Sequence, residues 1–242
     1  MKKTIVITGA SRGIGKAIAI ELAGKDTNIV INCVNNVDKL NEVRSIIEEK
    51  GSVCETFIGD MGNYSDVQKM FDMCLQRFGH VDMLINNAGI SVVGLFQDMG
   101  EDEWHRICNT NIDSVFNCCH FAVKDMMKRH CGKIINISSV WGLYGASCEV
   151  AYSATKGAVN SFTRALAKEL APSGIQVNAV ACGAIDTEMN SHLSDDDKAE
   201  LAEEIPAGRF GSPQEVAELV KSLSRMNSYL TGQIITLDGG WI

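Results

Sequence analysis

The chain has 242 residues, a formal net charge of −8, 45% hydrophobic residues and 21% charged residues. These values are ordinary for a globular protein with a large core, and mild acidity without a dense basic tract argues against a nucleic-acid or anionic-membrane partner. The N-terminal apolar run ends at Gly9, and no stretch approaches the roughly 18 apolar residues of a membrane span, so we expect a cytoplasmic protein without a signal peptide.

Cysteine usage indicates the same compartment. The nine cysteines include no C-x-x-C pair, and most lie in apolar runs such as "VFNCCHF". We interpret them as reduced, buried small hydrophobes. No cysteine and histidine have the spacing of metal ligands, so no metal site is expected.

Short β-branched runs alternate with longer stretches of helical spacing along the chain. The runs predict strands at residues 4–8, 28–32, 53–59, 81–86, 133–138, 175–181 and 233–238. The stretches between them predict helices at 13–24, 38–50, 64–79, 101–130, 151–171 and 213–226.

This alternation, with strands that are apolar on both faces, predicts an α/β fold. We expect a single doubly wound Rossmann domain over residues 1–242, with about seven parallel strands and helices on both faces. The polar, acidic segment 186–213 follows a strand and is expected to be an irregular, mobile loop.

The first predicted strand runs into "TGASRGIG" at residues 8–15. Its glycines permit a tight turn and let backbone N–H groups approach a pyrophosphate at the start of the next helix. Their place in the first βα turn favours a dinucleotide site, and the alternative is a loop that needs glycine for packing alone. The expected cofactor contacts here are Gly9, Ser11, Arg12, Gly13, Ile14 and Gly15.

The second predicted strand ends in "INCVNN", which offers Asn32 and Asn35 as cofactor contacts. Sites selective for NAD usually have an acid here for the ribose 2′-OH, and no carboxylate occurs before Asp38. Arg12 supplies a guanidinium that can meet a 2′-phosphate. The sequence therefore favours NADP (NADPH), with NAD as the alternative if Arg12 is only a solvated loop residue.

Polar residues also end the next three predicted strands, at the edge where a doubly wound sheet binds its ligand. After the third strand, Asp60 is expected to accept a hydrogen bond from an adenine amino group, or else to cap the next helix. The fourth strand ends in "NNAG" and the fifth in "NISS". From these segments we expect cofactor contacts at Met61, Asn87, Ala88 and Gly89, and hydroxyls at the rim from Ser138 and Ser139.

Tyr152 and Lys156 are four residues apart in "EVAYSATKGAVNSF", residues 149–162. A helix brings such a pair onto one face, roughly 5–6 Å apart at Cβ. A positive charge at that distance lowers the pKa of the phenol and makes it a proton donor near neutral pH. An isolated pair of this kind is more often a surface tyrosine beside a solvated lysine, so the other motifs must decide.

Taken together, "TGASRGIG", "NNAG", Asn111 in "NTNIDSVF", Ser139 and the Tyr152–Lys156 pair resemble the short-chain dehydrogenase/reductase family. The resemblance covers essentially the whole chain and includes the spacing of 13 residues from Ser139 to Tyr152. Within the family, the chain is most similar to 3-oxoacyl-[acyl-carrier-protein] reductases. It is also similar to a bacterial branch that includes reductases of a 5-aminopentanone group attached to elongation factor P.

The resemblance implies a role for each of four residues. Tyr152 is the expected general acid for a carbonyl oxygen, Lys156 lowers its pKa and holds the nicotinamide ribose, and Ser139 orients the carbonyl. Asn111 is expected to hold a water that relays protons through Lys156. The implied activity is reduction of a ketone to a secondary alcohol by NADPH. The further cofactor contacts that the resemblance implies are Tyr152, Lys156, Gly183, Ile185 and Thr187.

One position departs from the family pattern, because Cys182 precedes Gly183 where a proline is usual. Loss of the proline frees a backbone N–H and adds torsional freedom beside the nicotinamide. We expect a looser loop with activity retained, and a buried, unreactive thiol.

The sequence leaves several substrates open. A 3-oxoacyl thioester is favoured, and the alternatives are a 5-aminopentanone on elongation factor P, a hydroxysteroid or another small ketone. A catalytically silent NADP(H)-binding sensor is the alternative of a different class. The expected pocket contacts are mostly apolar or aromatic: Ser139, Trp141, Leu143, Tyr144, Cys148 and Met189.

An acidic carrier protein and further copies of the chain are the expected partners. Family members dock the carrier on basic residues, but the second docking arginine is replaced here by Ser173, which weakens that assignment. Family members commonly form tetramers through the two long helices and the last strand, so we expect a homotetramer or dimer. The candidate docking residues, which equally complement a helix dipole, are Lys124, Lys128, Arg129, His130 and Lys133.

Overall fold

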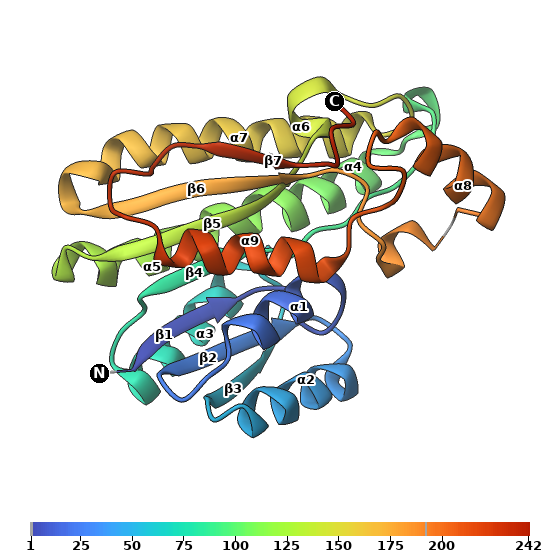
Figure 1. Cartoon of the computed structure of the whole chain (residues 1–242). Coiled ribbons are helices and arrows are strands. Elements are labelled where there is room, and N and C mark those ends of the chain that lie inside the picture. Colours follow the sequence, from blue (N-terminus) through green and yellow to red (C-terminus); the bar gives the residue numbers. More distant parts are fainter. Residues whose placement is uncertain (1, 192) are drawn as a thin grey trace.

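The computed structural model describes residues 2–191 and 193–242, and its centre is a seven-stranded parallel sheet (Figure 1). The strands follow the spatial order β3-β2-β1-β4-β5-β6-β7, and each neighbouring pair is parallel. The predicted α/β fold with a doubly wound parallel sheet is therefore confirmed. The strands are β1 (Lys3–Ile7), β2 (Thr27–Cys33), β3 (Val53–Ile58), β4 (Met83–Asn86), β5 (Gly132–Ser139), β6 (Ile175–Cys182) and β7 (Ile234–Leu237).

Helices cover both faces of the sheet and enclose two hydrophobic cores. In β1, Ile5 and Ile7 belong to one core and Val6 to the other, because successive side chains of a strand point to opposite faces. Burial on both faces explains why the strands are almost continuously apolar. The first core is completed by α1 (Gly13–Leu22), α2 (Val37–Glu49) and α9 (Pro213–Arg225), and the second by α3 (Tyr64–Phe78), α5 (Ser114–Arg129) and α7 (Val150–Leu170).

The order of the strands reverses between β1 and β4. From β1 the chain winds outward through β2 and β3, and it then returns to β4 on the other side of β1. In such a sheet the loops after the two central strands diverge and leave a crevice at the carboxyl ends. The glycine loop after β1 and the "NNAG" loop after β4 therefore flank one cleft.

The predicted helix at 101–130 is confirmed over 101–129, but it contains a π-helical turn that was not predicted. The turn (Asn109–Asp113) lies between α4 (Glu101–Cys108) and α5. Asn111 in this turn is buried, and its side-chain amide pairs with the backbone of Ile90 through two hydrogen bonds of 2.9 Å. Single π-helical turns of this kind are frequent at functional sites, where they redirect a side chain.

Two short helices of the structure were not predicted from the sequence. The first, α8 (Asp195–Glu204), lies within the segment expected to be irregular and begins with a capping box formed by Ser194 and Asp197. The second, α6 (Trp141–Tyr144), is a single turn after β5 and is too short to show a helical pattern. The predicted strands agree with the observed bounds to within two residues.

None of the helices in the described part of the chain combines the length and apolarity that crossing a bilayer requires. All nine cysteines are free thiols. Most are buried, as predicted: Cys33, Cys54, Cys74, Cys118, Cys119 and Cys182.

Candidate active site

A cavity of about 1140 Å³ opens at the carboxyl ends of the strands, beside the reversal of strand order. Its walls come from the glycine loop, the loops after β2 to β6, and the start of α7. This is the usual place for a cofactor in a doubly wound sheet. Most predicted site residues line it: Gly9, Ser11, Arg12, Gly13, Ile14, Asn32, Asn35, Asp60, Met61, Asn87, Ala88, Gly89, Ser139, Trp141, Tyr152, Lys156, Gly183, Ile185, Thr187 and Met189.

Three of the expected substrate contacts lie outside the cavity wall. Leu143 and Tyr144 are exposed, because the single turn of α6 directs Trp141 toward the cavity and the residues after it toward solvent. Cys148 follows in a left-handed backbone conformation with a φ of 62° and does not line the cavity either. Gly15 and Asn111 lie behind the lining residues, where they support the walls.

Other lining residues were not predicted. The ring of Trp241 lies 4.8 Å from that of Trp141, which places the end of the chain beside α6 (Figure 1). A separation of one hundred residues left no sequence signal for this contact. The remaining unpredicted groups with polar side chains include Ser91, Arg106, Glu149 and Glu204.

The glycine loop has the geometry of a phosphate-binding turn. Gly9 and Gly13 have φ values of 64° and 54°, in the region that favours glycine. A Cβ on Gly9 would lie 2.9 Å from Cα of Ala88, so the loop after β4 packs directly on the turn. The first turn of α1 has no side-chain cap and no acidic residue, which leaves its N–H groups available to an anion. The loop therefore fits the pyrophosphate of a dinucleotide.

Two amide side chains hold this loop in place. Asn87 Nδ2 donates to the carbonyl oxygens of Thr8 and Gly9, both at 3.0 Å. Asn32 Oδ1 accepts from Gly9 N at 3.4 Å, and Asn32 Nδ2 donates to Gly59 O at 3.0 Å. The Asn32 side chain is thus engaged with backbone groups and links the glycine loop to β3, rather than reaching toward a ribose.

Asp60 lies against the cavity at the end of β3. Its Oδ1 accepts from Gly62 N at 2.9 Å and its Oδ2 accepts from Asn109 Nδ2 at 3.1 Å. The alternative role as a helix cap is wrong, because Asn63 caps α3 by accepting from Asp66 N.

Ser139, Tyr152 and Lys156 meet on one wall of the cavity. Ser139 is close enough to the Tyr152 phenol to affect its pKa, and the Ser139 hydroxyl accepts from Trp141 N at 3.2 Å. The Lys156 ammonium lies 5.5 Å from the centre of the Tyr152 ring and donates to Ile137 O at 2.9 Å. The pair is therefore part of the cavity wall, and the surface interpretation of the motif is wrong.

Asn111 lies next to this group. A Cβ on Gly89 would lie 3.4 Å from Asn111 Oδ1 and 3.5 Å from Lys156 Nζ, so both atoms border the same small space. Asn111 Nδ2 also donates to Thr155 Oγ1 at 3.0 Å, which ties the π-helical turn to α7.

With this geometry established, comparison with known sequences decides the family. The sequence model of the family described as short chain dehydrogenase matches residues 3–198. The chain belongs to the short-chain dehydrogenase family. It is an NAD(P)-dependent oxidoreductase.

Relatives of this dehydrogenase align along nearly its full length. The 3-oxoacyl-[acyl-carrier-protein] reductase FabG of Staphylococcus epidermidis (strain ATCC 35984) is 39% identical, over 99% of each chain. FabG of Staphylococcus aureus (strain N315) is also 39% identical, over 99% of this chain and 98% of its own. An uncharacterized oxidoreductase of Bacillus subtilis (strain 168), YmfI, shows 39% identity over 100% of this chain and 99% of its own.

Burial is the largest cause of the pKa shifts of Tyr152 and Lys156 in the dehydrogenase site. It raises the pKa of the Tyr152 phenol, against the hydrogen bond from Ser139, and the nearby Glu149 carboxylate adds to the rise. The predicted lowering of this pKa is therefore wrong for the protein alone, because removing the phenolate from water outweighs the attraction of the ammonium. Burial also lowers the pKa of Lys156 to about 8. At neutral pH the Lys156 side chain is therefore still mostly protonated and positively charged.

Cys182 ends β6 in register with Ser139 of β5 and is buried. Burial raises the pKa of its thiol to about 12, so the thiolate is scarce at neutral pH. The prediction that this thiol is buried is confirmed, and its raised pKa is what an unreactive thiol requires.

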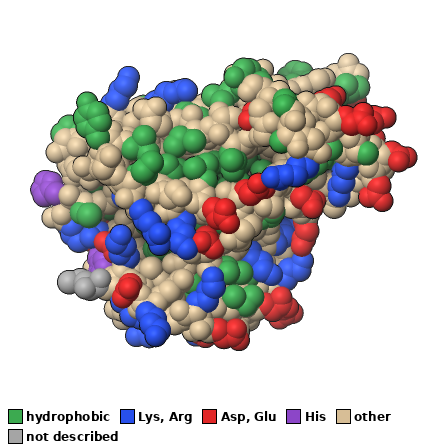
Figure 2. Space-filling model, viewed as in Figure 1, with side chains coloured by type: hydrophobic (Ala, Val, Ile, Leu, Met, Phe, Trp, Pro, Cys, Tyr) green, Lys and Arg blue, Asp and Glu red, His purple; other side chains and the backbone are tan. Residues whose placement is uncertain are grey.

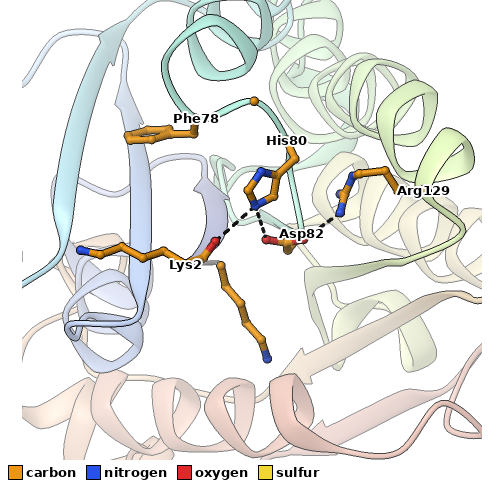
Figure 3. A pocket seen from close by; sticks show the side chains of 7 residues that line it. Lys2, Phe78, His80, Asp82 and Arg129 are labelled. Carbon is orange, nitrogen blue, oxygen red and sulfur yellow. Dashed lines mark hydrogen bonds and ion pairs between the residues drawn. The ribbon is translucent and has the colours of Figure 1, made fainter.

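A second hollow of about 510 Å³ lies at the other end of the sheet, where Asp82 points between His80 and Arg129 (Figure 3). Asp82 Oδ1 is 2.9 Å from Arg129 Nη1, and Asp82 Oδ2 accepts from Thr4 N at 2.8 Å and lies 3.0 Å from His80 Nε2. The Asp82–Arg129 ion pair and the hydrogen bond from Thr4 N join β1, the start of β4 and α5. We therefore interpret them as structural.

One residue of the predicted basic cluster, Arg129, lines this second hollow. Arg129 is held by Asp82 and Asp125, and Lys133 Nζ donates to Met226 O at 2.8 Å. Within one chain, Lys133 and Ser139 lie near opposite ends of β5, about 20 Å apart at 3.3 Å per residue. Two of the five basic residues therefore hold the fold, and the cluster does not border the cavity of its own chain.

Proposed function

We propose that this dehydrogenase reduces a ketone to a secondary alcohol with NADPH, and that a 3-oxoacyl thioester is its substrate. The observation that carries the proposal is that Ser139, Tyr152 and the buried Lys156 line the same cavity, with the Lys156 ammonium 5.5 Å from the centre of the Tyr152 ring. Two hydroxyl groups and a cation therefore belong to one wall of the cavity. A carbonyl oxygen that gains negative charge is stabilised by this arrangement.

Tyr152 is the proton donor in this proposal. Burial keeps the phenol protonated, and the protonated form is the one that can donate to a developing alkoxide. Lys156 then stabilises the negative charge left on the phenol oxygen. Ser139 donates a hydrogen bond to the carbonyl and fixes its orientation. A bound nicotinamide supplies the hydride.

Asn111 has a positioning role in the same proposal. Its Oδ1 accepts one hydrogen bond from Ile90 N, and a carbonyl oxygen has a second lone pair. That lone pair borders the same space as Lys156 Nζ. A water held between the two atoms would pass a proton from solvent toward Lys156, which would restore the proton that Tyr152 donates.

The preference for NADPH over NADH rests on charge at the adenosine end of the cavity. Arg12 supplies a cation, and Val34 and Asn35 after β2 provide no carboxylate for a ribose 2′-OH. Gly183, Ile185 and Thr187 are the proposed neighbours of the nicotinamide. NAD is the alternative cofactor.

We also propose that residues 1–242 form one functional domain in a cytoplasmic homotetramer or dimer. The near-complete alignment with relatives supports a single domain. Phe116 and Met127 of α5 are 50% and 39% exposed, and such apolar groups on one helix support contact between copies.

A second substrate, a ketone that carries an amine, is favoured by acidic groups around the cavity. The Glu149 carboxylate lines the cavity three residues before Tyr152 and accepts a hydrogen bond from Ser91 Oγ. Glu204 at the end of α8 also lines it. Figure 2 shows acidic side chains gathered at the end of the molecule where α8 lies. A 5-aminopentanone group on elongation factor P has the positive charge that these carboxylates attract.

Three substrates separate these candidates in an NADPH oxidation assay. They are acetoacetyl-CoA, a ketone with a terminal trimethylammonium group, and the neutral isostere of that ketone with carbon in place of nitrogen. A kcat/KM for acetoacetyl-CoA far above both ketones supports the thioester. A preference for the cationic ketone over its isostere that falls roughly fivefold in Glu149→Gln supports the amine. No turnover of any ketone, with NADPH still bound, supports a sensor.

A further inference from the structure

A carboxylate joins two cations at the rim of the cavity. Glu188 Oε2 lies 2.9 Å from Arg12 Nη1, and Glu188 Oε1 lies 2.9 Å from Lys39 Nζ. The three side chains, here called the Glu188 bridge, are about half exposed, at 50%, 56% and 49% respectively. Arg12 is the residue before α1, Lys39 lies in the first turn of α2, and Glu188 begins the short helical turn after β6. The bridge therefore joins the glycine loop, α2 and the segment after β6.

The Glu188 bridge stands where a bound dinucleotide presents its adenosine ribose. Asn35 and Asn36, just before α2, line the cavity together with Arg12 and Glu188. In doubly wound folds, the residues that follow the second strand of the unit contact this ribose. Lys39 lies three residues beyond Asn36 and is the first lysine or arginine after β2.

We propose that Arg12 and Lys39 together form the receptor for the 2′-phosphate of NADP(H), and that Glu188 occupies this receptor until the phosphate displaces it. Guanidinium and ammonium groups donate to carboxylate and phosphate oxygens alike. A phosphate with two negative charges is attracted by two cations more strongly than one carboxylate is. The inference rests on the proposed use of NADP(H) and adds to it a competing residue, Glu188.

Displacement of Glu188 changes the segment to which it belongs. Its neighbour Thr187 packs on the glycine loop, 3.5 Å from the position of a Cβ on Gly13. Asn190 Nδ2 anchors the same segment by donating to Ile185 O at 2.8 Å. Release of Glu188 therefore acts on the loop that carries the proposed nicotinamide contacts. A cofactor without the 2′-phosphate leaves the bridge closed.

The test uses adenosine ligands that cannot react. Calorimetric titration compares 2′,5′-ADP with 5′-AMP, which lacks the 2′-phosphate. We expect Glu188→Gln to bind 2′,5′-ADP about three- to tenfold more tightly, because two exposed ion pairs no longer have to break. Lys39→Gln is expected to weaken the same ligand by a similar factor. Glu48→Gln and Arg44→Gln are the controls. Each removes the Arg44–Glu48 ion pair of α2, whose atoms are 2.9 Å apart, and neither should change the affinity for 2′,5′-ADP.

Two further readouts identify competition at one receptor. The gain from Glu188→Gln should shrink in the Lys39→Gln background, because the two residues act at the same point. In the wild-type protein, 2′,5′-ADP should speed hydrogen exchange at the amides of 188–191, and 5′-AMP should not.

The possible failures are distinguishable. If the wild type prefers 2′,5′-ADP over 5′-AMP while Glu188→Gln binds it no more tightly, the competing role of Glu188 is overturned and the NADP(H) proposal stands. If the wild type shows no preference for 2′,5′-ADP, the use of NADP(H) fails, and this inference fails with it.

Discussion

The charge states of Tyr152 and Lys156 follow from burial more than from their proximity. The sequence predicts that the two side chains share a helix face, and the ammonium does lie 5.5 Å from the phenol ring. The lowered phenol pKa that the sequence predicts is wrong, because desolvation depends on what the rest of the chain places around the pair. The sequence also does not predict the contact of Arg12 with Glu188, because 176 residues separate the two side chains.

The lowered pKa of Lys156 makes the stability of the protein depend on pH. The folded pKa of about 8 lies below the ordinary value of 10.5, so the unfolded chain binds more protons between these values. Stability therefore rises with pH across that window. We expect the unfolding free energy of the wild type, relative to Lys156→Met, to increase by up to about 3 kcal/mol from pH 7.5 to pH 10. Urea denaturation of both proteins across this range measures the difference, and a flat difference would show that the ammonium is not desolvated.

At the scale of elements, the π-helical turn between α4 and α5 joins three parts of the site. Asn111 binds the backbone of Ile90 after β4 and the hydroxyl of Thr155 in α7. The sequence does not reveal this turn, because neither glycine nor proline interrupts the helical spacing of 101–130. Strands buried on both faces were located well, because their apolar runs are distinctive. The capping-box residues Ser194 and Asp197 do indicate the start of α8. The helix was still not predicted, because the acidic composition of the segment suggested an irregular loop.

Truncation of Asn111 is expected to loosen this junction. In Asn111→Ala the partly buried N–H and C=O of Ile90 lose their partners, and we expect a loss of roughly 2–3 kcal/mol in unfolding free energy. Asn41→Ala on the exposed side of α2 is the matched control and should change stability by less than about 0.5 kcal/mol. Chemical denaturation compares the two variants. Equal stability of both would mean that Asn111 does not support the loop after β4.

At the scale of the whole molecule, charge is distributed unevenly between the two ends of the sheet. The net charge is −8, and α8 beside the cavity contributes exposed acids from Asp195 to Glu204. The basic residues near the amino ends of the strands are partly paired within the fold. We therefore expect the end with the cavity to repel acidic partners and to attract cationic ones.

This charge distribution predicts opposite effects of salt on two substrates. For a 3-oxoacyl group on an acidic carrier protein, kcat/KM should rise about two- to tenfold when NaCl increases from about 20 to about 300 mM, because salt screens the repulsion. For a cationic ketone it should fall, and for its neutral isostere it should stay constant at saturating NADPH. A fall with the carrier substrate would instead indicate that a basic surface docks the carrier.

The central claim is that Tyr152 donates the proton in NADPH-dependent ketone reduction, and Tyr152→Phe tests it most directly. Oxidation of NADPH by the best substrate and the affinity for NADPH are measured on the same preparation, with Tyr229→Phe, at a 97% exposed position, as the control. We predict that kcat falls by roughly 10² to 10⁴-fold in Tyr152→Phe. NADPH affinity should change less than about threefold, and the control should match the wild type. Turnover within about tenfold of the wild type in Tyr152→Phe would contradict the assignment of the proton donor.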